Sequence, residues 1–203
     1  MRGTCGIFGR LLFGFEVHGA HRVPDSGPVL LLSNHQSHLD PVLVGVASPR
    51  QLRYLARDTL FVWPLGWLIR SLGAIPIDRE AGLAGLRATM RILRDQQALL
   101  LFPEGTRSPD GRLQPLKPGF LAVARRSGGA VVPVGIAGAF AALPRGRKLP
   151  TLHKIVIHFG EPLPAQQLMD LSDDQLLELV GGQIRAAAKA AQAFLPAAPQ
   201  AHN

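Results

Sequence analysis

Short, mostly apolar runs alternate with amphipathic segments along most of the chain. The apolar runs have the length and composition of buried β-strands, and they are Phe15–His18, Val29–Ser33, Leu52–Ala56, Ala74–Ile77, Ala98–Phe102, Ala130–Val134 and Lys154–Phe159. A helical pattern is found in Pro41–Ala47, Thr59–Leu72, Ala81–Gln96, Pro118–Arg126 and a long segment that opens at Ser172. Strands that alternate with helices predict an α/β fold, in which helices flank a central, largely parallel or mixed sheet.

Two of these helices carry signals beyond a short pattern. In Ala81–Gln96 the apolar residues form one stripe, which consists of Leu83, Leu86, Met90 and Leu93. Ser172 and Gln175 have the spacing of a capping box at the start of the last helix. We expect residues 1–195 to form a single domain, with 1–14 as a candidate short membrane-surface segment and 196–203 as a disordered tail.

The net charge indicates the class of partner, and the cysteine content indicates the compartment. Lys and Arg total 22 and Asp and Glu total 14, so the formal net charge is +8, which favours phosphates and acidic membrane surfaces as partners. Nucleic acid is not expected, because zinc-finger spacing, an aromatic RNA-binding signature and a basic helix are all missing. Cys5 is the only cysteine, as suits a reducing compartment. No apolar segment reaches the ~18 residues that span a bilayer, so we expect a cytoplasmic protein, peripheral on the inner face of the membrane.

The segment Asn34–Asp40 follows the run Val29–Ser33 and carries an imidazole and a carboxylate. An imidazole backed by a carboxylate can take a proton from an alcohol near neutral pH, and that hydroxyl can then attack an acyl group. Side chains five residues apart do not meet on a helix, so a loop has to bring His35 and Asp40 together. The ordinary alternatives are a helix N-cap for Asp40 and a satisfied polar residue at a strand end for His35.

A second strand end carries groups that suit an anion. In Phe102–Ser108, Gly105 permits close approach of backbone N–H groups, Thr106 adds a hydroxyl, and Arg107 can bind a phosphate with two hydrogen bonds. Glu104 can hydrogen-bond a substrate hydroxyl or hold an arginine. The alternative for this segment is a solvated turn.

Two further basic residues are candidates for binding the same anion. Lys117 can add a second positive charge, and Arg79, after the strand Ala74–Ile77, is placed to reach the same edge of the sheet. As alternatives, Lys117 is an exposed lysine, and Arg79 is a surface arginine that pairs with Asp78 or Glu80.

Three other features have two interpretations each. Pro133 interrupts a buried strand and so predicts an edge, a bulge or a bend. Trp63 and Trp67 are four residues apart, which fits core packing or anchoring at a membrane interface. The basic loop is either solvated or in contact with anionic lipid; its cations are Arg145, Arg147 and Lys148. The sequence contains no metal-ligand spacing and none of the motifs HExxH, paired CxxC, GxSxG, P-loop or GxGxxG. Their absence excludes a zinc hydrolase, a serine hydrolase, an NTPase and a dinucleotide-binding protein.

Four blocks, in this order, resemble the glycerolipid acyltransferase family, the group of 1-acylglycerol-3-phosphate acyltransferases. They are Asn34–Asp40, with the His-four-residues-Asp motif, Gly73–Arg79, Phe102–Ser108 and Val131–Gly138. The third block matches the family's Phe-Pro-Glu-Gly-Thr-Arg-Ser form in full, whereas Pro76 in the second stands where the family usually carries an aromatic or aliphatic residue. The resemblance covers roughly Glu16 to Pro162.

The resemblance implies an α/β acyltransferase that moves a fatty acyl chain from a thioester to the sn-2 hydroxyl of 1-acylglycerol-3-phosphate, giving phosphatidic acid. His35 would be the general base and Asp40 its orienting partner. The glycerol phosphate would be bound by Arg79, Glu104, Gly105, Thr106, Arg107 and Lys117, and the acyl site lined by Pro133 and Val134. No metal or bound cofactor is implied, and acyl-CoA or acyl-carrier protein would be the co-substrate.

Other functions remain open on the sequence. The same chemistry can act on another lysolipid acceptor, such as a lyso-ornithine lipid. A non-catalytic, membrane-surface lipid-binding protein and a binder of anions or nucleic acid driven by the net charge of +8 are alternatives from other classes.

Overall fold

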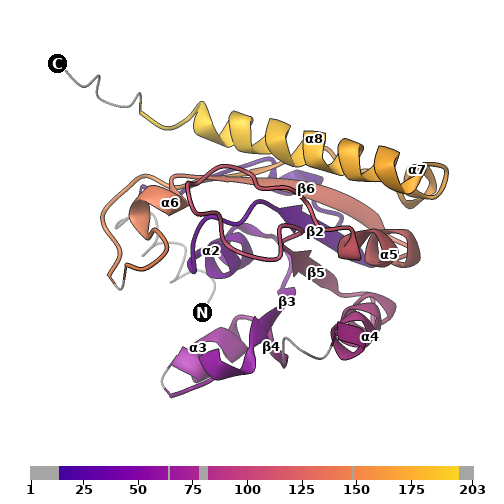
Figure 1. The fold of residues 1–203 in the computed structure, drawn as a ribbon, viewed down its shortest axis with the longest axis horizontal. Coiled ribbons are helices and arrows are strands. Elements are labelled where there is room, and N and C mark those ends of the chain that lie inside the picture. Colours follow the sequence, from indigo (N-terminus) through magenta and orange to yellow (C-terminus); the bar gives the residue numbers. More distant parts are fainter. Residues whose placement is uncertain (1–13, 64, 78–81, 148, 197–203) are drawn as a thin grey trace.

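The structure is a computed structural model that describes residues 14–63, 65–77, 82–147 and 149–196. A seven-stranded sheet, in the order β1-β7-β6-β2-β5-β3-β4, lies between helices (Figure 1). The strands are β1 (Glu16–His18), β2 (Val29–Ser33), β3 (Leu52–Arg57), β4 (Ala74–Ile77), β5 (Ala98–Leu101), β6 (Ala130–Ala137) and β7 (Val156–Phe159). All neighbouring pairs are parallel except β6 and β7, so the predicted α/β fold with a largely parallel or mixed sheet is confirmed.

The helices mostly fall where the sequence pattern places them. They are α2 (Asp40–Ala47), α3 (Leu65–Ser71), α4 (Gly82–Arg94), α5 (Gly119–Arg126), α6 (Ala139–Ala142), α7 (Ala165–Met169) and α8 (Asp173–Gln192), with 3₁₀ turns η1 (Ala20–Arg22) and η2 (Asp58–Leu60). The helix expected from Thr59 begins only at Leu65, because Pro64 lacks a backbone N–H and its ring would clash with a preceding helical turn. Within the described ranges, no helix combines the length and apolar character that crossing a membrane requires.

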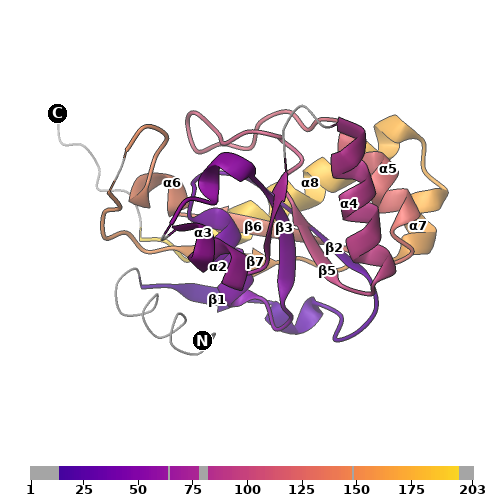
Figure 2. The same cartoon turned by 90° about the horizontal axis from the view of Figure 1, so that it is seen from below.

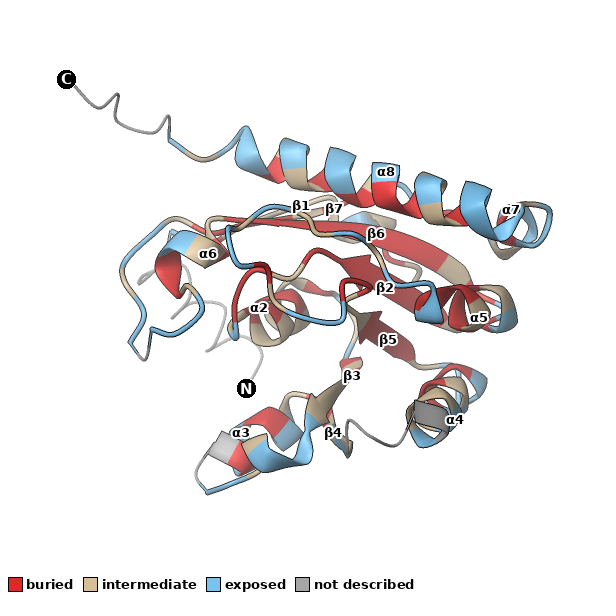
Figure 3. Ribbon diagram, viewed as in Figure 1, coloured by how far each residue is buried: buried red, intermediate tan, exposed pale blue. Residues whose placement is uncertain are grey.

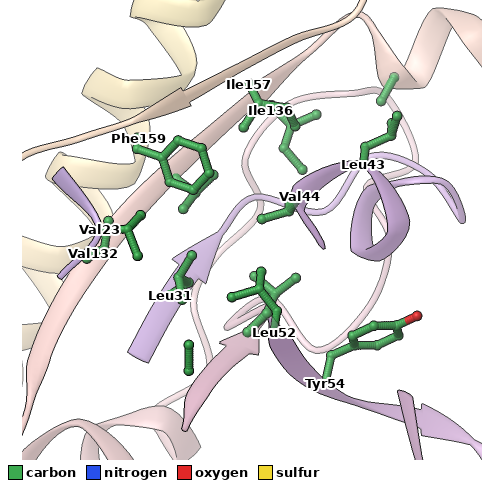
Figure 4. Close-up of a cluster of buried hydrophobic side chains, with 14 of the residues drawn as sticks. Val23, Leu31, Leu43, Val44, Leu52, Tyr54, Val132, Ile136, Ile157 and Phe159 are labelled. Carbon is green, nitrogen blue, oxygen red and sulfur yellow. The ribbon is translucent and has the colours of Figure 1, made fainter. Parts of the chain in front are cut away.

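The central strands are buried on both faces, and each face has its own core. Val29 and Leu31 of β2 point into one core with α2 and α3, whereas Leu30 and Leu32 point into the other with α4, α5, α7 and α8. Figure 4 shows the first core, and Figure 3 shows the buried sheet between the exposed outer faces of the helices. Because all five residues of β2 are buried, the strand is fixed in register from both sides.

Pro133 lies in β6, an interior strand, where the antiparallel register changes. Val134 lies opposite Phe159, but Val131 lies opposite Leu163, so the partner segment holds one additional residue between these points. The Pro133 carbonyl accepts a hydrogen bond from Gly160 at 2.8 Å. This local irregularity is the bulge that one of the three expectations for Pro133 describes, and it accommodates a residue without an N–H.

The sheet divides on the side that carries the chemistry. β3 pairs with β5 only as far as Tyr54 opposite Leu100, and beyond that point β3 stays with β4. Figure 1 shows β3, β4 and α3 set apart from the rest of the sheet. The carboxyl ends of β2, β3, β4 and β5 all lie at this edge, because these strands are parallel.

Candidate active site

The loop that follows β2 is tied to the surrounding elements by its polar side chains. The Asn34 side chain donates to the Ile136 carbonyl at 2.9 Å and accepts from the Ile136 N–H at 2.8 Å, so it continues the pairing of β2 with β6. Gln36 donates to the Gly111 carbonyl at 2.8 Å, and the Ser37 hydroxyl donates to the Leu143 carbonyl at 2.9 Å. This buried loop therefore has one conformation set by contacts on three sides.

The loop brings His35 and Asp40 together, as the five-residue spacing requires. Asp40 Oδ2 lies 2.8 Å from His35 Nδ1 and also accepts the N–H groups of Gln36 at 2.5 Å and Ser37 at 2.7 Å. The Asp40 side chain is completely buried, while the His35 side chain is 17% exposed. Because a carboxylate accepts this hydrogen bond, the proton is assigned to Nδ1, which leaves Nε2 as the basic nitrogen of a residue that lines the pocket.

The N-cap alternative for Asp40 is wrong in detail. Asp40 is itself the first residue of α2, and Leu39 occupies the cap position without a side-chain hydrogen bond. The carboxylate points back to the N–H groups of the preceding loop instead of forward to the helix. One oxygen takes all three hydrogen bonds, and among the described residues the other oxygen, Oδ1, has no partner.

The segment that follows β5 clamps His35 at three points. Glu104 Oε1 accepts the His35 N–H at 2.6 Å, and the Ser108 N–H donates to the His35 carbonyl at 2.7 Å. The Phe102 ring stacks on the imidazole, with ring centroids 4.0 Å apart and planes inclined by 20°. His35 is therefore fixed by its backbone and its ring face as well as by Asp40, which pre-organises the imidazole.

Glu104 contacts the backbone and not the open pocket. Its Oε2 accepts the N–H of Gln114 at 2.8 Å, so both oxygens are occupied. Burial raises the pKa of Glu104 above its ordinary value, although the two backbone hydrogen bonds act in the opposite direction. With both oxygens bound to backbone N–H groups, Glu104 is better placed to support His35 than to make the predicted contact with a phosphate.

A pocket of about 590 Å³ opens beside His35, where β3 and β5 separate. Its inner walls are apolar and come from Val42 of α2, Ile69 of α3 and Leu100 of β5. Tyr54, opposite Leu100 at the last β3–β5 pair, also lines it. The volume and the apolar walls are those of a site for an organic ligand with a substantial hydrocarbon part.

The rim of this pocket is cationic. Gly105, Thr106 and Arg107 line it as predicted, and Arg57 and Arg145 join them from β3 and from the loop after α6. Partial burial, Arg145 and, to a smaller extent, Arg57 lower the pKa of Arg107, whereas Asp40 acts in the opposite direction. None of the described residues that line the pocket is acidic. The rim can therefore hold an anion such as a phosphate.

Lys117 lies next to this rim but is not part of the pocket lining. A Cβ placed on Gly105, whose φ is +68°, would come within 3.1 Å of Lys117 Cδ, so the lysine side chain crosses over this glycine. Glycine suits position 105 because of its positive φ and the close side chain. The predicted role of Lys117 as a second cation stays a prediction.

Two predicted residues are not part of this assembly, and a third, Arg79, lies outside the described residues. Pro133 and Val134 are buried in β6 and do not line the pocket, because β6 is on the other side of β2 from the opening between β3 and β5. The structure instead lines the interior with residues of α2, α3, β3 and β5.

Sequence reasoning also missed residues that line the pocket. Arg57 lies at the end of a strand, which is the same kind of position that pointed to Arg79. This position in the sequence could have identified Arg57 as a residue of the site. Arg145 was assigned to a loop that is either solvated or in contact with lipid, and His38 was given no role. Among the described residues, no three His, Cys, Asp or Glu side chains gather closely enough to hold a metal ion.

Comparison with known proteins gives a consistent result. A family model described as Acyltransferase matches residues 14–137. A chloroplastic 1-acyl-sn-glycerol-3-phosphate acyltransferase, LPAT1 of Arabidopsis thaliana, is 31% identical over 72% of this chain and 43% of its own. The 1-acyl-sn-glycerol-3-phosphate acyltransferase of Streptococcus pneumoniae is 25% identical over 83% of this chain and 62% of its own. This chain thus spans about half the length of such relatives.

A solved structure agrees over nearly the whole chain. The 1-acyl-sn-glycerophosphate acyltransferase PlsC from Thermotoga maritima superimposes with a TM-score of 0.80 at 26% identity, covering 96% of this chain and 81% of the other. The family match includes β2, the loop with His35 and Asp40, and the Phe102–Ser108 clamp. The chain belongs to the acyltransferase family.

Proposed function

We propose that this protein transfers a fatty acyl chain from an acyl thioester to the sn-2 hydroxyl of 1-acylglycerol-3-phosphate, forming phosphatidic acid. The observation that carries the proposal is the convergence of a hydrogen-bonded His35–Asp40 pair and a cationic rim on one largely apolar pocket. The relatives that share this fold bear the names of enzymes for this acceptor.

His35 acts as the general base. Its Nε2 removes the proton of the acceptor hydroxyl while that oxygen attacks the thioester carbonyl carbon. The resulting imidazolium is stabilised by Asp40 through Nδ1, in the same way as the carboxylate of a Ser-His-Asp triad stabilises its imidazolium. When the tetrahedral intermediate collapses, the C–S bond breaks and the imidazolium returns its proton to the leaving thiolate. The products are an ester and a free thiol, and no acyl-enzyme is needed.

The two ends of the pocket take different parts of the substrates. The phosphate of the acceptor lies at the rim, against Arg107 and the neighbouring guanidinium groups. Hydrocarbon lies against the apolar walls, where burial contributes about 0.8 kcal/mol per methylene. Acyl-CoA or acyl-carrier protein supplies the thioester, and no bound cofactor takes part. The lipid acceptor brings the protein to an anionic membrane surface, peripheral on its inner face.

The decisive assay offers purified protein labelled acyl-CoA or acyl-carrier-protein donors and a panel of acceptors. We expect phosphatidic acid from 1-acylglycerol-3-phosphate, with slower reaction on lyso-ornithine lipid and neutral monoacylglycerol. A faster reaction on one of these other acceptors would move the assignment to it. Absence of transfer from either donor to all acceptors would refute the proposal in favour of a non-catalytic lipid-binding protein.

His35→Ala should lower kcat by roughly 10²-fold or more, which is the usual effect of removing a general base. His21→Ala is the matched control, because His21 is exposed on η1 and does not line the pocket. Near-normal turnover by His35→Ala would exclude the mechanism.

A further inference from the structure

Two exposed apolar patches lie beside the mouth of the pocket. The α3 patch consists of Val62, Trp63, Trp67 and Leu68, with Trp63 88% and Trp67 62% exposed. The loop patch consists of Leu149, 77% exposed, and Leu152, 74% exposed. The expectation that the two tryptophans pack in the core is therefore wrong. Large side chains as exposed as these, gathered in a patch, mark a surface that something covers.

The pocket connects the two patches. One side of the pocket is lined by residues in or next to the α3 patch, namely Thr59, Leu60 and Ile69. Another side is lined by Arg145, which lies four residues before Leu149 of the loop patch. Figure 1 and Figure 2 both place α3 and the loop after α6 at the same end of the molecule, with α7 at the opposite end. Figure 3 shows exposed residues in both segments. A single covering partner would therefore lie over the mouth of the pocket.

The charges around the patches select the class of partner. Residues 143–150 contain Arg145, Arg147 and Lys148 and no acidic residue. Arg57 and Arg70 are exposed on either side of the α3 patch, and the Arg70 guanidinium lies 5.0 Å from the centroid of the Phe61 ring. Tryptophan has an apolar ring with a polar N–H and prefers the headgroup level of a bilayer, where basic side chains meet anionic lipid. This combination fits a lipid surface better than a protein partner.

We propose that the α3 patch and the loop patch together form a membrane-docking surface that seats the pocket mouth on an anionic bilayer. The tryptophans enter the headgroup region, and Arg70 and Arg147 contact lipid phosphates. The inference builds on the proposed function, because a lipid acceptor could then pass from the bilayer into the pocket without crossing water. Docking itself requires no catalytic step.

The sequence offers a direct probe, since Trp63 and Trp67 are its only tryptophans. Intrinsic fluorescence of the wild-type protein therefore reports on the α3 patch alone. With vesicles of phosphatidylcholine and phosphatidylglycerol, we expect a blue shift, and quenching when the lipids carry bromine on their acyl chains. Vesicles of phosphatidylcholine alone should give a weaker response. The proposal would be overturned if the protein sediments with vesicles but its tryptophan fluorescence is not quenched. It would also be overturned if the blue shift accompanies self-association of the protein and does not depend on vesicles.

Variants test the two parts of the surface separately. Trp63→Ala with Trp67→Ala should lower the vesicle partition coefficient about tenfold or more, measured by co-sedimentation, because interfacial binding scales with buried apolar area. Met169→Ala is the matched control, since Met169 is 65% exposed on α7 at the opposite end. Arg70→Glu with Arg147→Glu should weaken binding to anionic vesicles only, whereas Arg126→Glu on α5 should not. Equal binding by all variants would refute the assignment.

Failure of this inference can be distinguished from failure of the proposed function. A water-soluble, short-chain 1-acylglycerol-3-phosphate below its micelle concentration reports on transfer without a bilayer. Transfer to this acceptor without quenching on anionic vesicles would remove the docking surface and keep the function. Quenching without transfer would remove the function and keep the docking surface.

Discussion

Tyr54 combines burial with an unsatisfied hydroxyl at the floor of the pocket. The residue is 4% exposed, and within the described part of the chain its hydroxyl has no hydrogen-bond partner. Figure 4 shows its ring at the margin of the core, with the hydroxyl directed away from Leu52. A buried polar atom without a partner loses its hydration and gains nothing in return. The hydroxyl should therefore lower stability, while the ring contributes to the core.

Tyr54→Phe should leave the free energy of unfolding at neutral pH unchanged or raise it by about 1 kcal/mol. The effect should grow with pH, because burial raises the pKa of Tyr54 from 10.0 to about 12. Between these values the folded state holds the phenol proton more tightly than the unfolded state, so wild-type stability falls as pH rises through this window. Phenylalanine cannot ionise, so the variant should not share this loss. Urea unfolding of both proteins at neutral and alkaline pH provides the comparison.

Tyr54 is the only tyrosine in the sequence, so tyrosinate absorbance of the folded wild-type protein titrates this residue alone. Ionisation near the ordinary value would contradict the burial argument, and so would a clear loss of stability in Tyr54→Phe.

At the scale of elements, the two loops after β2 and β5 form one unit. The Phe102–Ser108 segment holds the backbone N–H, the carbonyl and the ring of His35, while Glu104 also binds Gln114. β2 and β5 are adjacent and parallel, so both loops leave the same edge of the sheet. The second loop therefore positions the first, and in the proposed mechanism its carboxylate acts through His35.

Glu104→Gln should lower kcat with little change in the KM of the acceptor. Glutamine offers one acceptor oxygen, so one of the two buried N–H groups loses its partner at a cost of about 1–3 kcal/mol, and His35 is held less firmly. Glu178→Gln, at an exposed position on α8, is the control. If Glu104 instead contacts the acceptor, its substitution should raise the KM of the acceptor while kcat is retained. Steady-state kinetics with varied acceptor separates these results.

The elements show how far the sequence predicts the fold. All seven strands were predicted. The central strands are runs of buried apolar residues, whereas β1 is only half-buried, and β2 and β5 carried their chemistry directly behind them. The short helices α6 and α7 gave no periodic signal over four and five residues. The separation of β3 from β5 was also not predictable, since it depends on where strand pairing ends and not on residue type. That separation creates the pocket. Without knowledge of it, the lining of the acyl site was expected at Pro133 and Val134, as the family resemblance implied.

At the scale of the whole molecule, three arginines from separate elements meet at one pocket. Arg57 comes from β3, Arg107 from the loop after β5 and Arg145 from the loop after α6, and all three line one pocket. Bringing like charges together is unfavourable unless an anion neutralises them. Composition alone does not reveal this cluster, because the formal net charge of +8 says nothing about where the charges lie.

Arg107→Ala should raise the KM for 1-acylglycerol-3-phosphate about tenfold or more, because a hydrogen bond to a charged group contributes about 1.5–3 kcal/mol. The KM for a neutral monoacylglycerol should hardly change, since that acceptor has no phosphate at the rim. Arg107→Lys should recover part of the loss, as it keeps the charge but not the bidentate geometry. Arg126→Ala, exposed on α5, is the control.

Added salt should raise the KM of the phosphate acceptor in the wild-type protein more than in Arg107→Ala, because screening weakens a contact that the variant lacks. Equal losses on both acceptors would place the phosphate elsewhere and leave the three arginines without an anion to bind.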